Sequence, residues 1–212
     1  MNRTMILTMI FSALMLSACA QKKGGTAKER VVGDGCEGCE AVHEYGAKAL
    51  TWIDTLPDFH EPGPKLEISG TIFRKDGKTP AKDVILYIYH TDQSGEYSTK
   101  GNETGWGKRH GYIRGWIKTN ADGRYKFYTL RPAAYPGRQN PEHIHPVIKE
   151  PGIKEYWIDE YLFDDDPILS ARERANQPGR GGKGIIKTTR DASGMQIAKR
   201  DIVLGLNVPG YE

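Results

Sequence analysis

The chain has 212 residues, with 30 basic and 27 acidic side chains and a formal net charge of +3. A chain of this length can bury the core of one domain, and its size does not require a second domain. Because the charges are scattered without a basic stripe, the composition argues against nucleic acid as a partner.

Residues 1–19 have the pattern of a bacterial lipoprotein signal peptide, with a basic residue near the start, an apolar run and small residues that end at Cys19. The letters Leu-Ser-Ala-Cys resemble a lipobox, in which the cysteine becomes the lipid-bearing first residue. The alternative is a plain secretory signal in which Cys19 is incidental. We expect an exported lipoprotein of the bacterial cell envelope, in contact with the membrane only through its lipid anchor. Since Ala20 follows the cysteine in place of Asp, we expect the outer membrane in a Gram-negative cell.

Residues 20–39 are predicted to tether the anchor to the folded domain, because Lys, Gly and Thr predominate without hydrophobic periodicity. The segment ends in GDGCEGC, which contains Cys36 and Cys39. In an exported protein, an even number of remaining cysteines favours a structural disulfide. Reactive thiols and a metal site are the alternatives, although the sequence shows neither a thioredoxin-like setting nor a second pair of metal ligands.

Residues 40–64 are predicted to form a short helix and a proline-rich lead-in to the main domain. Apolar side chains recur at helical spacing within residues 40–53, and the prolines at positions 57, 62 and 64 end any helix.

Residues 65–212 have the pattern of an all-β domain, in which short alternating segments are separated by turn sequences such as Asn-Ala-Asp-Gly. Many short strands and little helix predict an antiparallel β-sandwich with long loops. The strand and turn sequences resemble prealbumin-like modules, which also occur as non-catalytic carrier or stalk domains. The Gly- and Arg-rich residues 170–183 are expected to form a surface loop. The expected strands lie in KLEISGTIF, VILYIYH, YIRGWIK, GRYKFYTL, HIHPVIK and EYWIDEYLF, with two more around the Ala-Ser-Gly turn near the chain end.

Two histidines, His143 and His145, are separated by one residue within a predicted strand. Side chains two residues apart on a strand point to the same face, with Cα atoms roughly 6.5–7 Å apart. Two imidazoles placed in this way can bind one metal ion, while Ile144 points into the core. The alternative is two ordinary polar residues on a solvent-exposed face. Two phenols precede the pair, Tyr97 in SGEY and Tyr135 in RPAAYP.

The order of the motifs SGEY, DGRYKFYTLRPAAYP and PEHIH resembles the intradiol ring-cleavage dioxygenases, the family of catechol 1,2-dioxygenase and protocatechuate 3,4-dioxygenase. The resemblance covers roughly residues 64 to 169. It implies that Tyr97, Tyr135, His143 and His145 bind one non-haem ferric ion, and that substrate displaces Tyr135. A trivalent cation can hold a phenol as phenolate. Two phenolates and two imidazoles form a hard, electron-rich site that favours Fe(III) over Fe(II).

The implied reaction is the cleavage of a catechol-type ring by O2 between its two hydroxylated carbons, which gives a muconate-type diacid. Besides Tyr135, three positions are expected to affect catalysis, and two of them depart from the family pattern. Asn140 stands where much of the family has an arginine, and the nearby Arg138 is the expected substitute. Glu160 stands where a glutamine is usual. An anion there repels a catecholate unless it is protonated, paired with Arg138 or turned away.

Two other functions stay open. A non-catalytic carrier or adhesion sandwich explains the strands and turns but gives no role to Tyr97 or to the histidine pair. A metal enzyme of another reaction type would use the two histidines and Glu160 as a facial Fe(II) or Zn triad, which leaves the phenols unexplained. His90 and His110 are expected at solvated positions near the pocket rim, and a supporting contact to the metal ligands is the alternative. The oligomeric state also stays open, a homo-oligomer included.

Overall fold

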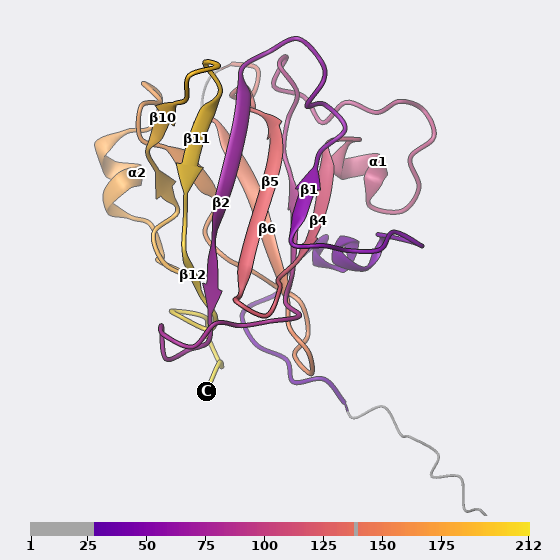
Figure 1. The fold of residues 1–212 in the computed structure, drawn as a ribbon, viewed down its shortest axis with the longest axis vertical. Coiled ribbons are helices and arrows are strands. Elements are labelled where there is room, and N and C mark those ends of the chain that lie inside the picture. Colours follow the sequence, from indigo (N-terminus) through magenta and orange to yellow (C-terminus); the bar gives the residue numbers. More distant parts are fainter. Residues whose placement is uncertain (1–27, 138–139) are drawn as a thin grey trace, which may run out of the picture.

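A computed structural model describes residues 28–137 and 140–212 of the chain. Two sheets pack face to face to form a β-sandwich, and long loops surround it (Figure 1). The prediction of an all-β sandwich is therefore confirmed. The predicted signal peptide, Cys19 and Arg138 lie outside the described residues.

The first sheet is built around β2, which pairs antiparallel with β5 from Lys65 opposite Leu130 to Thr71 opposite Arg124. The other pairs of β2, with β11 and β12, are parallel, as is the pair of β1 with β5. Parallel neighbours need long connections, which local sequence does not reveal, so the predicted antiparallel sandwich also contains parallel strand pairs. The strands of this sheet are β1 (Ile53–Thr55), β5 (Arg124–Leu130), β2 (Lys65–Phe73), β11 (Gln196–Lys199), β10 (Thr188–Arg190) and β12 (Ile202–Val203).

The second sheet is built around β3, which pairs antiparallel with β4 on one side and with β6 on the other. The segment EYWIDEYLF, predicted as one strand, forms two short strands, β7 and β8, that pair with different parts of β6. Between them the Asp159 carboxylate accepts hydrogen bonds from the backbone N–H groups of Gly179 (2.8 Å) and Arg180 (3.0 Å), which ties this part of the chain to a loop. The strands of this sheet are β4 (Arg114–Lys118), β3 (Ile85–Tyr89), β6 (His143–Lys149), β7 (Tyr156–Trp157), β8 (Tyr161–Phe163) and β9 (Ile185–Ile186).

The main core lies between the two sheets, and a second apolar cluster covers the outer face of the second sheet. Side chains alternate along β3, so that Leu86 and Ile88 point into the main core while Tyr87 lies in the outer cluster. The chain before β1 covers this outer cluster through the 3-10 helix η1 (Cys39–His43). The Trp116 indole N–H donates a hydrogen bond of 3.0 Å to the Ala41 carbonyl and fixes η1 on the sheet.

The N-terminal helix is shorter than predicted. The apolar spacing predicts a helix within residues 40–53, whereas η1 ends at His43 and turns follow it. Gly46 adopts a left-handed φ of +57°, and Ile53 begins β1 beside β5. Pairing with a neighbouring strand thus outweighs a weak local helix preference.

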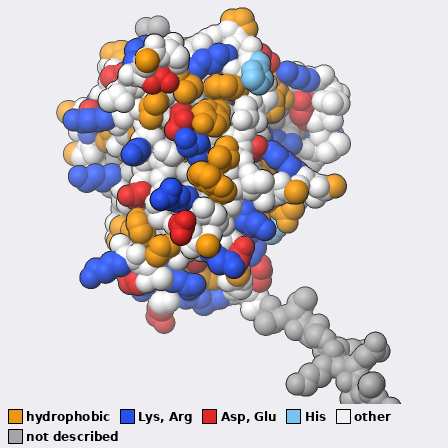
Figure 2. All heavy atoms as spheres, in the orientation of Figure 1, with side chains coloured by type: hydrophobic (Ala, Val, Ile, Leu, Met, Phe, Trp, Pro, Cys, Tyr) orange, Lys and Arg blue, Asp and Glu red, His pale blue; other side chains and the backbone are white. Residues whose placement is uncertain are grey.

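Two short helices lie in the loops. They are α1 (Gly107–His110) and α2 (Ala171–Ala175), the latter within the predicted surface loop and capped by the Ser170 side chain. On the face shown in Figure 2, basic and acidic side chains are interspersed. Within the described residues, no helix is both long enough and apolar enough to cross a bilayer.

Candidate metal centre

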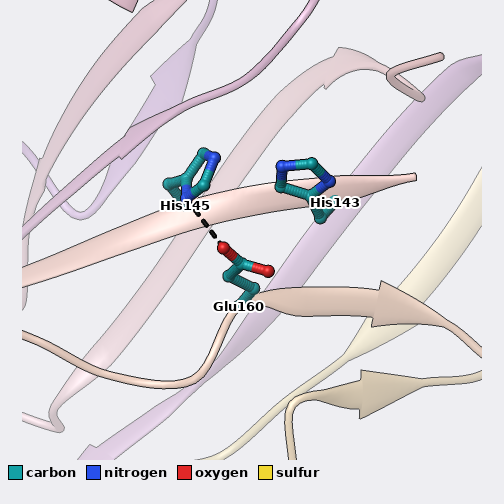
Figure 3. Close-up of side chains that lie close together, drawn as sticks. All are labelled: His143, His145 and Glu160. Atoms are coloured by element: carbon teal, nitrogen blue, oxygen red, sulfur yellow. Dashed lines mark ion pairs between the residues drawn. The ribbon is translucent and has the colours of Figure 1, made fainter. Parts of the chain in front are cut away.

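Strand β6 places His143 and His145 side by side on the outer face of the second sheet. Ile144, between them, is fully buried in the core between the sheets, as strand alternation predicts. Figure 3 shows both rings projecting from the same strand, with Glu160, from the segment that leads into β8, beside His145. His143 is buried and His145 is partly exposed, so the pair faces an accessible edge of the sheet.

The Nδ1 atom of each histidine has an acceptor as its neighbour. His143 Nδ1 lies 2.7 Å from the Pro141 carbonyl oxygen, and His145 Nδ1 lies 3.0 Å from a carboxylate oxygen of Glu160. Because a carbonyl and an ionised carboxylate can only accept, both Nδ1 atoms carry the proton. When such a ring carries only this one proton, its lone pair is on Nε2, the atom available to a metal ion.

Both Nε2 atoms face a phenol oxygen. His143 Nε2 lies 3.1 Å from Tyr135 Oη, and His145 Nε2 lies 2.8 Å from Tyr97 Oη. The two phenol oxygens are 2.6 Å apart. The four atoms therefore form one continuous cluster, made of two oxygen and two nitrogen donors. Such a set is suited to Fe(III) because ionised phenols are hard anionic ligands. The structure brings together the four side chains that the family resemblance predicts as metal ligands.

Tyr97 is positioned by a turn around Asp92. One carboxylate oxygen of Asp92 accepts hydrogen bonds from the backbone N–H groups of Ser94 (2.7 Å) and Glu96 (3.2 Å). The other accepts a hydrogen bond of 2.5 Å from the Ser98 hydroxyl. An Asp side chain that bonds the backbone two residues onward stabilises a tight turn without any strand partner. The turn holds Tyr97 at a fixed place although it lies in a loop.

The loop of Tyr97 is packed directly against the loop of Tyr135. Gly95 has a φ of +78°, and a Cβ atom added to it would lie 2.1 Å from the Ala134 carbonyl oxygen. The Thr91 hydroxyl donates a hydrogen bond of 2.7 Å to the Ala133 carbonyl. Only glycine permits this close approach of two backbones. The contact accounts for the meeting of two phenols that are 38 residues apart in sequence.

The phenols and His143 are uncharged in the absence of a metal ion. Burial raises the pKa of Tyr97, and its hydrogen bond with Tyr135 raises it further. Burial also raises the pKa of Tyr135. The pKa of His143 is lowered by burial and then by the neighbouring His145. A cation at the cluster would reverse these preferences, because it stabilises phenolate and the neutral imidazole lone pair.

Glu160 contacts His145 on the side away from the phenols. Burial disfavours its ionisation, but the hydrogen bond from His145, and the charge of this ring when it is protonated, lower the Glu160 pKa overall. Ligand-type atoms of Glu160 and the two histidines lie within 4.8 Å of one another. Since Glu160 binds Nδ1 whereas the phenols face Nε2, the carboxylate orients the ring from behind. Asn140, by contrast, is exposed.

A cavity of about 500 Å³ opens beside His145, and Tyr89 on β3 forms one of its walls. Tyr89 stands opposite His145 in the β3–β6 pair and stacks on its ring, with centroids 4.6 Å apart. On its other side Tyr89 stacks on His110 at 3.8 Å. Sequence reasoning missed Tyr89, because its place depends on the pairing register. His90 and His110 are both buried, so the prediction of solvated positions for them is wrong.

A family model described as Dioxygenase matches residues 41–180, which is more than half of the chain. The chain belongs to this family of dioxygenases. Its relatives by sequence are intradiol ring-cleavage enzymes, as the order of the tyrosine and histidine motifs predicts.

Two curated relatives illustrate the similarity. Catechol 1,2-dioxygenase 1 of Acinetobacter lwoffii is 40% identical over 94 residues, which are 44% of this chain and 27% of the relative. The protocatechuate 3,4-dioxygenase beta chain of Burkholderia cepacia is 25% identical over 138 residues, which are 59% of this chain and 58% of the relative. The chain thus spans less than two thirds of the length of either relative.

Solved structures share the fold. The dioxygenase domain of a dioxygenase and carbohydrate-binding fusion protein from Streptomyces sp. SirexAA-E superposes with a TM-score of 0.56 at 23% identity, over 81% of this chain and 96% of that one. The 3-chlorocatechol 1,2-dioxygenase of Rhodococcus opacus 1CP gives a TM-score of 0.57 at 22% identity, over 75% of this chain and 67% of that one. At such identities the similarity supports the sandwich fold alone.

Proposed function

We propose that the protein is a non-haem Fe(III)-dependent intradiol dioxygenase that cleaves a catechol-type ring between its two hydroxylated carbons with O2. The observation that carries the proposal is the cluster of Tyr97, Tyr135, His143 and His145, in which two phenol oxygens and two imidazole Nε2 atoms lie 2.6–3.1 Å from their neighbours. Membership of the dioxygenase family supports the same reaction class.

Tyr135, Tyr97 and His145 have different roles in the proposed reaction. The ferric ion, when bound, would supply a Lewis acid that favours the ionised phenol and catechol oxygens. Tyr135 lies next to the exposed Pro136, and we propose that it is the phenol that gives way to substrate and takes up a substrate proton. Tyr97 is fixed by the Asp92 turn and stays in place. The proton donated by His145 Nδ1 to Glu160 keeps the Nε2 lone pair directed at the centre.

Oxygen uptake by the iron-loaded protein tests the reaction. We expect one O2 to be consumed per catechol and a ring-opened diacid to form. We also expect a visible absorption band from phenolate-to-iron charge transfer. Tyr97→Phe should lose much of this band, whereas Tyr128→Phe, which removes a phenol on β5, should keep it. Iron-loaded protein that stays colourless would refute the ferric assignment.

A second candidate is a facial metal triad of His143, His145 and Glu160, which the short distances between their ligand-type atoms favour. Metal analysis of Glu160→Gln separates the two functions. In the intradiol proposal Glu160 only orients His145, so bound iron should remain near one per chain, with affinity reduced about 10–100-fold at most. In the triad a direct ligand is lost, and the metal should be lost with it.

We also propose that the enzyme is anchored to the cell envelope by a lipid on Cys19. The proposal rests on the sequence of residues 1–19. Cells that express the wild-type chain should incorporate a labelled fatty acid into it, and the Cys19→Ser chain should stay unlabelled. Equal labelling of both chains would contradict the proposal.

A further inference from the structure

The cavity beside His145 has a wall that does not come from the sheet. Residues 35–38 line it together with Tyr89, Trp157 and Glu160. Residues 35–38 belong to the disulfide loop, which we define as residues 35–39. Cys36 and Cys39 are joined there, with Cα atoms 5.6 Å apart. The N-terminal segment thus extends to the edge of the candidate metal centre.

The disulfide loop is fixed firmly to the sheet. Cys39 is 1% exposed and packs in the outer apolar cluster with Trp116. Gly38 has a φ of +86° and is buried, and a Cβ atom added to it would lie 2.7 Å from His110 Nε2. Because His110 stacks on Tyr89, and Tyr89 on His145, a continuous stack joins the loop to a candidate iron ligand. The loop and the centre therefore have a fixed relative position.

The charges around the cavity restrict what can enter it. Within the described ranges, its carboxylates are those of Glu37, Asp159 and Glu160, and no lysine or arginine lines it. Glu37 pairs with Arg109, which lies outside the lining, and Glu160 pairs with His145, which is part of it. An anionic group on the substrate would face three carboxylates, and no lysine or arginine of the lining could pair with it. Its volume of about 500 Å³ lies within the range typical of small-molecule pockets, and it exceeds that of a bare catechol ring. The excess leaves room for a ring substituent.

We propose that the disulfide loop is the specificity-determining wall of the substrate pocket, and that the pocket takes a catechol whose ring substituent is uncharged or positively charged. The inference rests on the proposed function, because it assumes that a catechol binds at the centre beside His145. In this proposal the ring is on the His145 side of the cavity, and the substituent extends between the disulfide loop and Trp157, which both line it.

Binding of three catechols to the iron-loaded protein without oxygen tests the charge preference. Ethylcatechol, aminoethylcatechol and carboxymethylcatechol carry substituents of similar length and different charge. Shifts of the charge-transfer band give each Kd. We expect the carboxymethyl compound to bind at least about tenfold more weakly than the other two, a difference of about 1.4 kcal/mol. Equal or tighter binding of the anion overturns the charge preference. Failure of every catechol, bare catechol included, to bind overturns the proposed function instead.

A matched pair of glycine variants tests the wall. Gly38→Ala adds a Cβ that must push the disulfide loop away from His110. Gly194→Ala is the control, because Gly194 has the same φ of +86° and its added Cβ would meet nothing within 4 Å. We expect Gly38→Ala to weaken the binding of ethylcatechol and aminoethylcatechol about threefold or more relative to the binding of bare catechol. Gly194→Ala should leave all three Kd values unchanged. An unchanged ratio in Gly38→Ala overturns the inference.

A second variant covers the case in which Gly38→Ala does not fold. The Cys36→Ser, Cys39→Ser double variant removes the cross-link without adding bulk to the stack on His110. The Kd ratio of substituted to bare catechol should again rise, because the freed loop no longer holds the substituent. A ratio equal to that of the wild type overturns the inference by this route too.

Discussion

Replacement of Gly95 by alanine tests how the fold brings two loop tyrosines to one centre. A residue other than glycine at a φ of +78° loses about 1–2 kcal/mol of stability. The new Cβ would also lie 2.1 Å from the Ala134 carbonyl oxygen, whereas such contacts are essentially never closer than 3.0 Å. The loops that carry Tyr97 and Tyr135 must therefore separate by about 0.9 Å, the difference between these two distances.

A shift of this size is large for a metal site, since productive ligand geometry has to be held within about 0.5 Å. We expect ferric affinity to fall about 10–100-fold, the range seen when supporting contacts of metal ligands are removed. Titration of the protein with ferric iron, followed by the charge-transfer band, measures this effect. Denaturant unfolding of the metal-free protein measures the loss of stability.

Gly101→Ala is the matched control. Gly101 has a φ of +90°, and its added Cβ would meet nothing within 4 Å, so the variant has the backbone cost without the collision. If Gly95→Ala binds ferric iron within about twofold of Gly101→Ala, the contact with Ala134 does not set the spacing of the phenols. That result would refute the reasoning even if both variants were destabilised.

The remaining predictions concern stability. Burial lowers the pKa of His110 to about 4. A histidine whose pKa is lower in the folded than in the unfolded protein stabilises the fold at a pH above its ordinary pKa of about 6.5. This stabilisation is lost as the pH falls from about 6.5 toward 4. From pH 7 to pH 5 the unfolding free energy of the wild type, measured in denaturant, should therefore fall by about 2 kcal/mol more than that of the His110→Asn protein. Phe127 is fully buried between the sheets, and Phe127→Ala should cost about 3–5 kcal/mol. The neighbouring Tyr128→Phe should change the denaturant midpoint little, and a similar loss in both variants would contradict the core assignment.

Strand alternation predicts part of the centre correctly. The pattern HIH places two imidazoles on one face of β6 and Ile144 in the core, and the structure has this arrangement. The period of two is a local property of an extended chain, so it can be read without knowledge of the partners of the strand. The tyrosine positions have no such periodicity. They came from the resemblance to a family, and the structure adds the Gly95 contact that brings them together.

The sequence does not reveal features that depend on distant partners. Tyr89 becomes part of the pocket only because β3 and β6 pair in a register that sets it opposite His145. The disulfide loop, expected to be part of a tether, contributes a pocket wall because η1 packs on the outer face of the second sheet. In both cases tertiary packing decides the role, and local propensity gives no sign of it.

The central place of β2 has a consequence for the synthesis of the chain. The backbone N–H of Thr71 on β2 donates to the Asp201 side chain, 130 residues later in the sequence. At roughly 5–20 residues per second, a ribosome needs on the order of 10 s to cover that distance. During this time one edge of β2 has no strand to pair with, and an open edge can template association with another chain. We therefore expect the first sheet to close only after the last strands are made, and chains truncated before β11 to aggregate instead of forming a smaller domain.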